Sequence, residues 1–259
     1  MLSNLSNKIN FKYINESPSS KLFIFLHGFM GDHNDWQTLD PYIKIPRALY
    51  IDIPGHGKSP LSADACWQSV CDQILELIKG FEGEKILVGY SLGGRIALQL
   101  LAQSPDTFQL VICESSSFGI QDPLEKQQRK AKDENLFRDV GDAKDFLDFL
   151  YKWYDMQLFE GMKNKEDVIL KKSKGNFKKY SHAIAVLGVG RQPYLLEKLI
   201  ALKRKIIYLA GTRDSKYMGL SQKWLEKGGA VKTFSNASHN IHNDQPALYG
   251  KFLTHYLDC

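Results

Sequence analysis

Long hydrophobic runs are absent from this chain of 259 residues, and so is an apolar stretch near its amino end. The uninterrupted runs, such as Leu22–Leu26, reach about five residues, whereas a membrane-spanning helix needs roughly 20. The first residues, MLSNLSNKINFKY, are polar and lack the apolar segment of a secretory signal. We therefore expect a cytoplasmic protein that does not insert into membranes.

Cysteine is also scarce, and its positions show neither a CxxC pair nor the spacing of a metal site. Without a secretion signal, scattered cysteines are typical of free thiols in a reducing compartment. The sequence likewise lacks an HExxH motif, a phosphate-binding glycine loop and a dinucleotide fingerprint. We expect no metal and no cofactor. The four cysteines are Cys66, Cys71, Cys113 and Cys259.

The chain carries only a small excess of positive charge, with a formal net charge of +5. Hydrophobic residues make up 43% of the chain and charged residues 24%, as in ordinary soluble globular proteins. This weak basic character does not indicate a nucleic-acid partner. Lysines crowd residues 161–180, which is typical of a solvated helix face. The length suits one large domain with an insertion, and we expect it to act as a monomer.

Short apolar runs bounded by glycine, proline and aspartate alternate with helical patterns. Nearly continuous apolar character is typical of strands buried on both faces. Alternation of such strands with helices predicts a parallel sheet with right-handed crossovers. We expect strands at 21–28, 47–55, 85–91, 109–116, 205–211 and 230–235, and helices at 66–79, 94–102, 220–227 and 246–257.

Between residues 118 and 190 the chain is charged and shows no strand-like run. A block of helices inserted into a sheet domain predicts a cap over the carboxyl ends of the strands, where open α/β sheets bind ligands. We therefore divide the chain into an α/β core (1–117 and 191–259) and a helical cap (118–190). Cap helices are expected at 124–140, 142–154, 163–172 and 177–187.

The segment GYSLG at 89–93 is a G-x-S-x-G motif between a predicted strand and a predicted helix. In that setting the small residues permit the strained turn that lifts a serine hydroxyl above the sheet, so Ser91 is the predicted nucleophile. A hydroxyl needs a base at neutral pH. His239, in the loop before the closing helix, fits the order Ser, acid, His of this arrangement. His242, three residues further, is the alternative.

The acid of such a triad holds the imidazole in the correct tautomer. Asp214 follows the strand at 205–211 and is the predicted acid, with Glu114 as the alternative. An oxyanion hole needs two backbone N–H groups, one from the residue after the nucleophile and one from the loop after an earlier strand. We expect the amides of Leu92 and Phe29 to supply them.

Arg95 lies four residues after Ser91, one helical turn along, and so shares its face. A cation in the first turn of a helix opposes the helix dipole, so it needs either a nearby carboxylate or an anionic ligand. Hydrolases of neutral esters have no use for a cation beside the nucleophile. Arg95 therefore favours an acidic substrate.

Five segments together resemble one branch of the α/β hydrolases, the 2-succinyl-6-hydroxy-2,4-cyclohexadiene-1-carboxylate synthases of menaquinone biosynthesis. The resemblance runs from about residue 22 to 255, and it implies the α/β-hydrolase fold: a mostly parallel central sheet, flanked by helices, with an inserted helical cap. The segments are HGFMGDHNDW (27–36), DIPGHGKS (52–59), GYSLGGR (89–95), GTRDSKY (211–217) and SHNIHNDQP (238–246).

The resemblance implies a lyase that eliminates pyruvate from an enolpyruvyl cyclohexene carboxylate. Ser91, activated by His239, would take a proton from the ring, while the Phe29 and Leu92 amides bind charge on a carbonyl-derived oxygen.

A substrate with three carboxylates implies cationic partners. Arg95 and Arg129 match two arginines of the family, and Lys172 stands where the family has a third, with Lys171 or Lys174 as the alternatives. Tyr90 and Trp153 match aromatic positions of the pocket. The implied partner is thus a small anionic polycarboxylate.

Two other hypotheses remain open. A carboxylesterase or carbon–carbon bond hydrolase of the same fold accounts for the triad but leaves Arg95 and Arg129 unexplained. A non-catalytic α/β-hydrolase module that binds a ligand can also keep a triad, and it would bind an anion without turnover.

Overall fold

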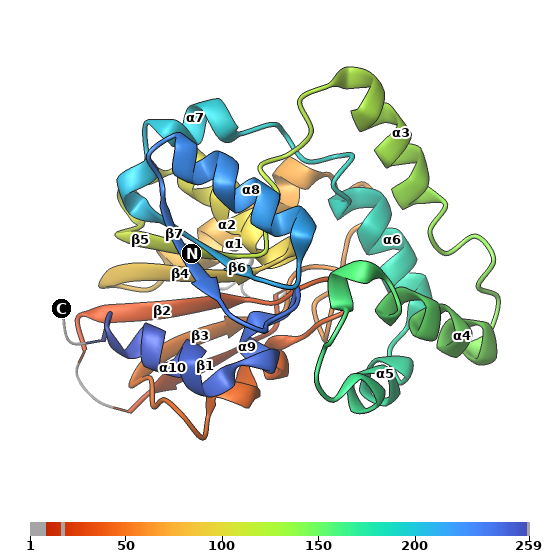
Figure 1. Ribbon diagram of the computed structural model, residues 1–259, viewed down its shortest axis with the longest axis horizontal. Helices are drawn as coiled ribbons and strands as arrows, with labels where there is room; N and C mark the ends of the chain where they lie inside the picture. The colour runs from red at the N-terminus through yellow and green to blue at the C-terminus, as the bar shows by residue number, and fades with distance from the viewer. Residues whose placement is uncertain (1–8, 17–18, 258–259) are drawn as a thin grey trace.

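The computed structural model describes residues 9–16 and 19–257 and contains a seven-stranded sheet with the order β1-β3-β2-β4-β5-β6-β7 (Figure 1). Six strands run parallel, and β1 pairs antiparallel with β3 at one edge. The strands are β1 (Phe11–Asn15), β2 (Lys21–Leu26), β3 (Arg47–Ile51), β4 (Glu84–Tyr90), β5 (Leu110–Glu114), β6 (Ile206–Gly211) and β7 (Ala230–Phe234). The expected α/β fold with a mostly parallel sheet is confirmed.

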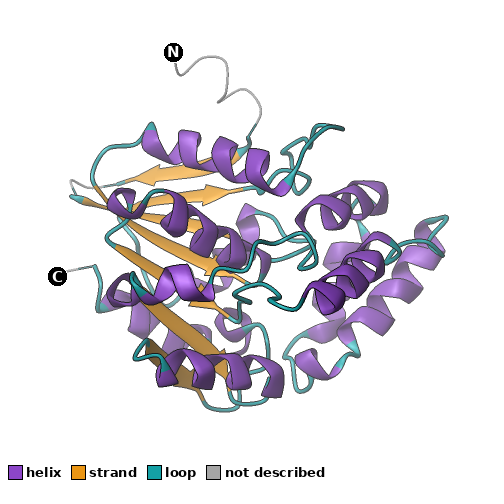
Figure 2. Cartoon of the chain, turned by 90° about the horizontal axis from the view of Figure 1, so that it is seen from above, coloured by secondary structure: helices purple, strands orange, loops and turns teal. Residues whose placement is uncertain are grey.

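Helices cover both faces of the sheet (Figure 2). The α-helices of the core are α1 (Trp67–Lys79), α2 (Leu92–Gln103), α7 (Leu196–Ile200), α8 (Ser215–Glu226), α9 (Ile241–Asp244) and α10 (Pro246–Thr254). Short 3-10 helices are η1 (His33–Leu39), η2 (Pro105–Thr107), η3 (Gln157–Phe159) and η4 (Lys203–Lys205).

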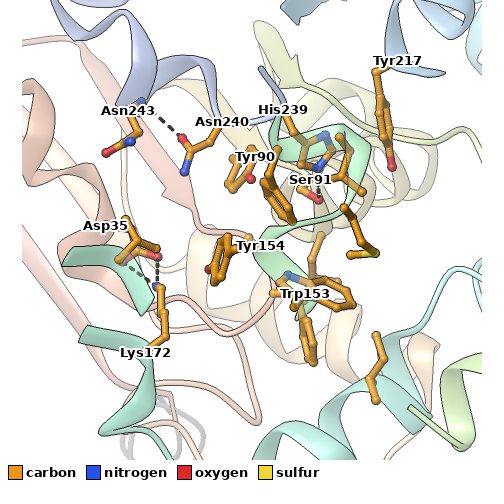
Figure 3. Close-up of a pocket in the computed structure, with 18 of the residues that line it drawn as sticks. Asp35, Tyr90, Ser91, Trp153, Tyr154, Lys172, Tyr217, His239, Asn240 and Asn243 are labelled. Atoms are coloured by element: carbon orange, nitrogen blue, oxygen red, sulfur yellow. Dashed lines mark hydrogen bonds and ion pairs between the residues drawn. The ribbon is translucent and has the colours of Figure 1, made fainter. Parts of the chain in front are cut away.

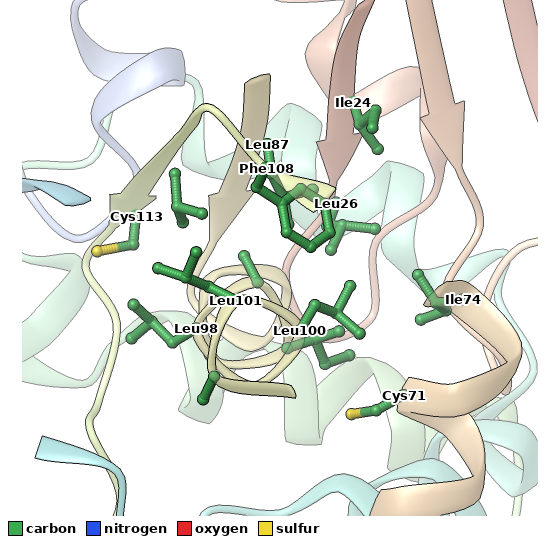
Figure 4. Packing of buried hydrophobic residues seen from close by; sticks show 14 of the residues in the cluster. Ile24, Leu26, Cys71, Ile74, Leu87, Leu98, Leu100, Leu101, Phe108 and Cys113 are labelled. Atoms are coloured by element: carbon green, nitrogen blue, oxygen red, sulfur yellow. The ribbon is translucent and has the colours of Figure 1, made fainter. Parts of the chain in front are cut away.

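The largest buried cluster lies between the sheet and helices α1 and α2. Leu98 and Leu101 of α2 pack there among side chains of the central strands such as Leu87, and Ile74 of α1 lies beside them (Figure 4). Because α2 is buried along almost its whole length, it is held firmly behind the strand that precedes it. Burial of apolar area at about 25 cal/mol per Å² makes such clusters the main stabilising contribution.

Several elements differ from the sequence-based expectations, among them the short helices α7 and α9, which were not predicted. Strand β1 was not predicted, because Lys12 and Asn15 interrupt its apolar residues and most of the strand is exposed, as suits an edge strand. Helix α8 begins at Ser215 rather than at 220, since the Asp214 side chain caps it by accepting a hydrogen bond from the Tyr217 amide. Helix α3 ends at Glu134 instead of reaching 140.

The segment between β5 and β6 contains helices α3 (Pro123–Glu134), α4 (Ala143–Tyr154), α5 (Lys165–Ser173) and α6 (Phe177–Leu187). This helical insert (residues 123–187) lies to one side of the sheet, beyond the strand ends (Figures 1 and 2). It has an aromatic-rich cluster of its own, which includes Phe137, Phe146 and Tyr154. We propose that the insert is the cap, with the boundaries at 118 and 190 given above.

Among the residues that the structure describes, none of the helices has the length and apolar character needed to span a membrane. Three of the four cysteines are free, Cys66 at the surface and Cys71 and Cys113 in the interior. Cys259 and the first eight residues of the polar amino-terminal segment lie outside the described residues.

Candidate active site

Ser91 occupies the sharp turn between β4 and α2, with φ of 51° and ψ of −106°. Non-glycine residues rarely adopt a positive φ, so the turn is strained. The strain is tolerated because the neighbours at Gly89 and Gly93 have no side chain. A Cβ at Gly93 would overlap the Leu26 carbonyl, and one at Gly89 would lie 2.5 Å from the Gly93 carbonyl oxygen.

His239 and Asp214 complete a hydrogen-bonded chain that starts at Ser91. The His239 Nε2 atom lies 3.0 Å from Ser91 Oγ, and Nδ1 lies 2.7 Å from Asp214 Oδ2. Both residues are buried, and the Tyr217 ring packs 4.6 Å from the imidazole. Since a carboxylate only accepts, Nδ1–H donates to Asp214, and Nε2 is left to accept the serine proton. The structure thus brings the three predicted catalytic residues together (Figure 3).

The loop that carries His239 is attached to the helical insert. The His239 amide donates to the Leu158 carbonyl oxygen at 3.0 Å. The buried Asp244 carboxylate accepts from the Ser238 amide at 2.7 Å and from the Lys163 amide at 3.1 Å. The position of the imidazole therefore depends on the insert as well as on the core.

The alternative acid and base of the sequence analysis, Glu114 and His242, bind each other and not Ser91. The His242 Nδ1 atom lies 2.8 Å from Glu114 Oε2, and both side chains are fully buried. Tyr90 separates the two histidines, with its ring centroid 5.4 Å from that of His239 and 5.0 Å from that of His242.

The predicted oxyanion-hole residues, Phe29 and Leu92, lie on the wall of the same cavity as Ser91. Within the described part of the chain, neither amide N–H has a hydrogen-bond partner. Two unpaired donors beside a nucleophile are what an oxyanion hole requires. The Phe29 ring contacts several aromatic rings, including Trp153 at 5.8 Å and Tyr180 at 6.1 Å, so the ring serves packing.

Ser91 opens into a cavity of about 690 Å³ between the core and the helical insert. Arg95 lies in its wall and is only 5% exposed. The Arg95 Nη1 atom has no hydrogen-bond partner among the described residues, and the guanidinium lies 5.4 Å from the Trp67 ring centroid. Burial lowers the pKa of Arg95 to about 10, so the group keeps its charge at neutral pH. A buried cation with an unpaired donor is costly unless a compensating negative charge lies beside it.

The remaining predicted substrate-contacting residues line the same cavity. Arg129 pairs with Asp133 at 2.7 Å, one turn along α3. Lys172 pairs with Asp35 at 2.7 Å and is only 9% exposed. In Figure 3 this pair lies on the opposite side of Ser91 from Tyr217. The five residues concerned are Tyr90, Arg95, Arg129, Trp153 and Lys172.

Lys216 and Asp35 are charged residues of the cavity that sequence reasoning missed. Lys216 stands at the exposed rim, and its pKa is lowered first by burial of its stem and then by the nearby Arg129 charge. Its position in the DSKY run was the available signal. Asp35 had no signal, because its lysine partner is 137 residues away in the sequence.

Within residues 9–16 and 19–257, no group of three or more histidine, cysteine, aspartate or glutamate side chains is arranged to hold a metal ion.

Comparisons with known proteins show the family to which the chain belongs. A model of the alpha/beta hydrolase family matches residues 23–250. The 2-succinyl-6-hydroxy-2,4-cyclohexadiene-1-carboxylate synthase of Citrobacter koseri is 30% identical over 236 residues, which cover 89% of this chain and 91% of that protein. The synthase of the same name from Salmonella agona is 28% identical over 233 residues, which cover 89% of this chain and 91% of that protein.

Two solved structures share the fold. MenH from S. aureus superimposes with a TM-score of 0.83 at 24% identity, covering 96% of this chain and 97% of the other. A thermophilic esterase from Thermogutta terrifontis gives a TM-score of 0.74 at 19% identity, with coverages of 96% and 92%.

Proposed function

The chain belongs to the alpha/beta hydrolase family, in the branch of the 2-succinyl-6-hydroxy-2,4-cyclohexadiene-1-carboxylate synthases, and we propose that it is a lyase with that activity. The substrate would be 2-succinyl-5-enolpyruvyl-6-hydroxy-3-cyclohexene-1-carboxylate, from which the enzyme eliminates pyruvate. The reaction adds no water and needs no acyl-enzyme.

The observation that carries this proposal is the buried Arg95 guanidinium, which shares one cavity with Ser91. A triad alone serves an esterase equally well. An unpaired buried cation beside it is costly unless a ligand supplies the compensating negative charge. The proposed substrate has three carboxylates, and Arg129 and Lys216 stand at the same cavity to bind a second.

The positions of the ring double bonds in the proposed substrate and in the product define the chemical step. A proton leaves ring carbon 2, which bears the succinyl group, and its electron pair forms a new double bond between carbons 2 and 3. The existing double bond moves from carbons 3 and 4 to carbons 4 and 5, and the bond from carbon 5 to the enolpyruvyl oxygen breaks with its electrons on that oxygen. Negative charge develops on the succinyl carbonyl oxygen as the proton leaves. The Phe29 and Leu92 amides are suitable donors for that oxygen.

Ser91 and His239 would move the proton. His239 Nε2, 3.0 Å from Ser91 Oγ, accepts the hydroxyl proton while Oγ takes the proton of the ring. Oγ is again a hydroxyl once it holds the ring proton. The proton held by His239 then goes to the leaving enolpyruvate, which tautomerises to pyruvate, and the neutral imidazole is restored. Asp214 stabilises the intervening imidazolium.

The test follows pyruvate release from this substrate with the wild type, Ser91→Ala and Arg95→Ala. We expect both variants to lose most of the activity, because one lacks the base and the other an anion partner. Ser173→Ala and Arg138→Ala, at positions that do not line the cavity, are the matched controls and should resemble the wild type. Full activity of Ser91→Ala would refute the proposed proton transfer.

The esterase hypothesis is supported by the complete triad and the two unpaired amides. If the protein releases no pyruvate above the uncatalysed rate but hydrolyses p-nitrophenyl acetate, and Ser91→Ala abolishes that hydrolysis, the esterase hypothesis replaces the lyase. Binding of an anion without turnover of either compound would instead favour a ligand-binding module.

A further inference from the structure

A second cavity, of about 410 Å³, lies where the helical insert meets the core. One wall consists of core loops at residues 30–34 and 52–58, and the other of residues 171–180 from α5, α6 and their connection. We call it the seam cavity. Lys179 crosses it and donates to the Gly57 carbonyl oxygen at 2.9 Å.

The lining of the seam cavity is rich in positive charge. Asp52 and Asp32 are the carboxylates in the lining, and both have partners. Asp52 accepts from the Asn10 side chain, from the Lys58 amide and from His33, and Asp32 caps η1. Among the described residues, the Lys58 and Lys174 ammonium groups form no ion pair. The lysines that line the cavity are Lys58, Lys171, Lys172, Lys174 and Lys179.

The seam cavity and the active-site cavity share part of their walls. Asn34, Lys171 and Lys172 line both. At this shared wall the Asp35 carboxylate lies 2.7 Å from Lys172 Nζ and 3.2 Å from Lys171 Nζ. Burial alone would raise the pKa of Asp35, but the two ammonium groups outweigh it and hold that pKa below its usual range.

We propose that the seam cavity is an outer binding site for polycarboxylates, from which an anionic substrate reaches Ser91 by replacing Asp35 as the partner of Lys171 and Lys172. The nature of the anion rests on the proposed function. The lysine-rich wall attracts the anion. The ion pair of Asp35 with Lys171 and Lys172 at the shared wall separates the seam cavity from the active-site cavity.

Exchange of one carboxylate for another has a physical advantage. Breaking a buried ion pair outright is costly because it leaves an uncompensated charge. When an incoming carboxylate takes the place of Asp35, both lysines remain paired, and Asp35 regains water in the active-site cavity, whose wall it lines. Clefts lined by charge of one sign also raise the local concentration of an oppositely charged ligand.

The test uses citrate as a tricarboxylate probe, titrated calorimetrically at low ionic strength. The double variant Lys58→Gln/Lys174→Gln removes the two lysines without an ion pair, and we expect citrate to bind about tenfold more weakly. Lys198→Gln/Lys223→Gln changes the net charge equally on α7 and α8, away from α5 (Figure 1), and should bind like the wild type. Equal affinities of the two double variants would overturn the outer site.

Asp35→Asn tests the exchange step. It frees both lysines without changing the size of the side chain, so citrate should bind several-fold tighter than to the wild type. Unchanged or weaker binding would overturn the role of Asp35. Because the probe is not turned over, these results do not depend on pyruvate release. If pyruvate is released, the kcat/KM of Lys58→Gln/Lys174→Gln should fall about tenfold at low salt and approach that of the wild type at high salt.

Discussion

Glu114 connects the nucleophile to the loop of the base: its backbone carbonyl oxygen accepts from the Ser91 amide at 2.9 Å, and its carboxylate binds His242. The same carboxylate accepts from the Ile241 amide at 2.6 Å. The His242 ring in turn stacks on Trp36, with centroids 4.2 Å apart. Glu114, the alternative acid of the sequence analysis, therefore fixes the Ser91 turn and the loop that carries His239 relative to each other.

We expect Glu114→Gln to lower the free energy of unfolding by about 3 kcal/mol, because it removes the carboxylate that accepts buried hydrogen bonds from His242 and from the Ile241 amide. His242→Asn should have a comparable effect. In the double variant the losses should not add, with a coupling of about 1–3 kcal/mol. Urea unfolding of the four proteins measures this coupling, and strictly additive losses would show that the pair is not a unit.

Asp214→Asn should lower the rate of pyruvate release by about 10³-fold or more. The carboxamide can keep the hydrogen bond from the Tyr217 amide, but its NH₂ group facing His239 favours the tautomer whose Nε2 carries a proton. That tautomer cannot accept from Ser91. Steady-state kinetics on Asp214→Asn and on Asp106→Asn, an exposed control, measure the effect. Near-normal kcat in Asp214→Asn would contradict the triad.

Gly93→Ala should destabilise the protein by about 3 kcal/mol, since the new methyl group would overlap the Leu26 carbonyl and move the backbone near Phe29. The matched change is Gly219→Ala in α8, where an added Cβ meets no atom within 4 Å. That control should stabilise by about 0.5–1 kcal/mol through helix propensity. Thermal and urea unfolding distinguish the two. Equal stability of both variants would contradict the close packing at Gly93.

Asp35→Asn should cost about 2 kcal/mol of unfolding free energy at pH 7, as expected for a hydrogen-bonded ion pair. Because the folded-state pKa of Asp35 is depressed, its contribution is present above the unfolded pKa of about 4 and is lost as the pH falls further. The difference between wild type and variant should therefore shrink between about pH 4 and pH 2. Urea titrations at several pH values measure it, and a constant difference would argue against a charged pair.

Much of the fold was predictable because buried parallel strands have a simple signature. Strands such as β2 and β4 are apolar along most of their length, and the glycines around Ser91 mark the turn. Strand β1 was not predicted, because an exposed edge strand shows little of the continuous apolar character of a buried strand. The start of α8 was missed because it depends on a cap by Asp214, whose catalytic position was predicted on other grounds.

The site was predictable where the chemistry is local. Arg95 was expected to need a carboxylate or an anionic ligand, and its Nη1 atom has no hydrogen-bond partner among the described residues, so the ligand stays a prediction. Pairs of charged or hydrogen-bonded residues that are far apart in the sequence could not be predicted, because their spacing along the chain does not show which of them meet in the fold. The Asp35–Lys172 pair and the Glu114–His242 pair are of this kind.

The hydrogen bond from His239 to the Leu158 carbonyl oxygen has a consequence for chimeric enzymes. If the helical insert were only a lid, it could be transplanted between relatives to change substrate preference while the reactive centre stayed intact. Here the transplanted piece would also carry a support of the imidazole, together with the Lys163 contact to Asp244. Grafts that keep residues 157–163 with their own His239 loop should therefore preserve turnover better than grafts cut between them.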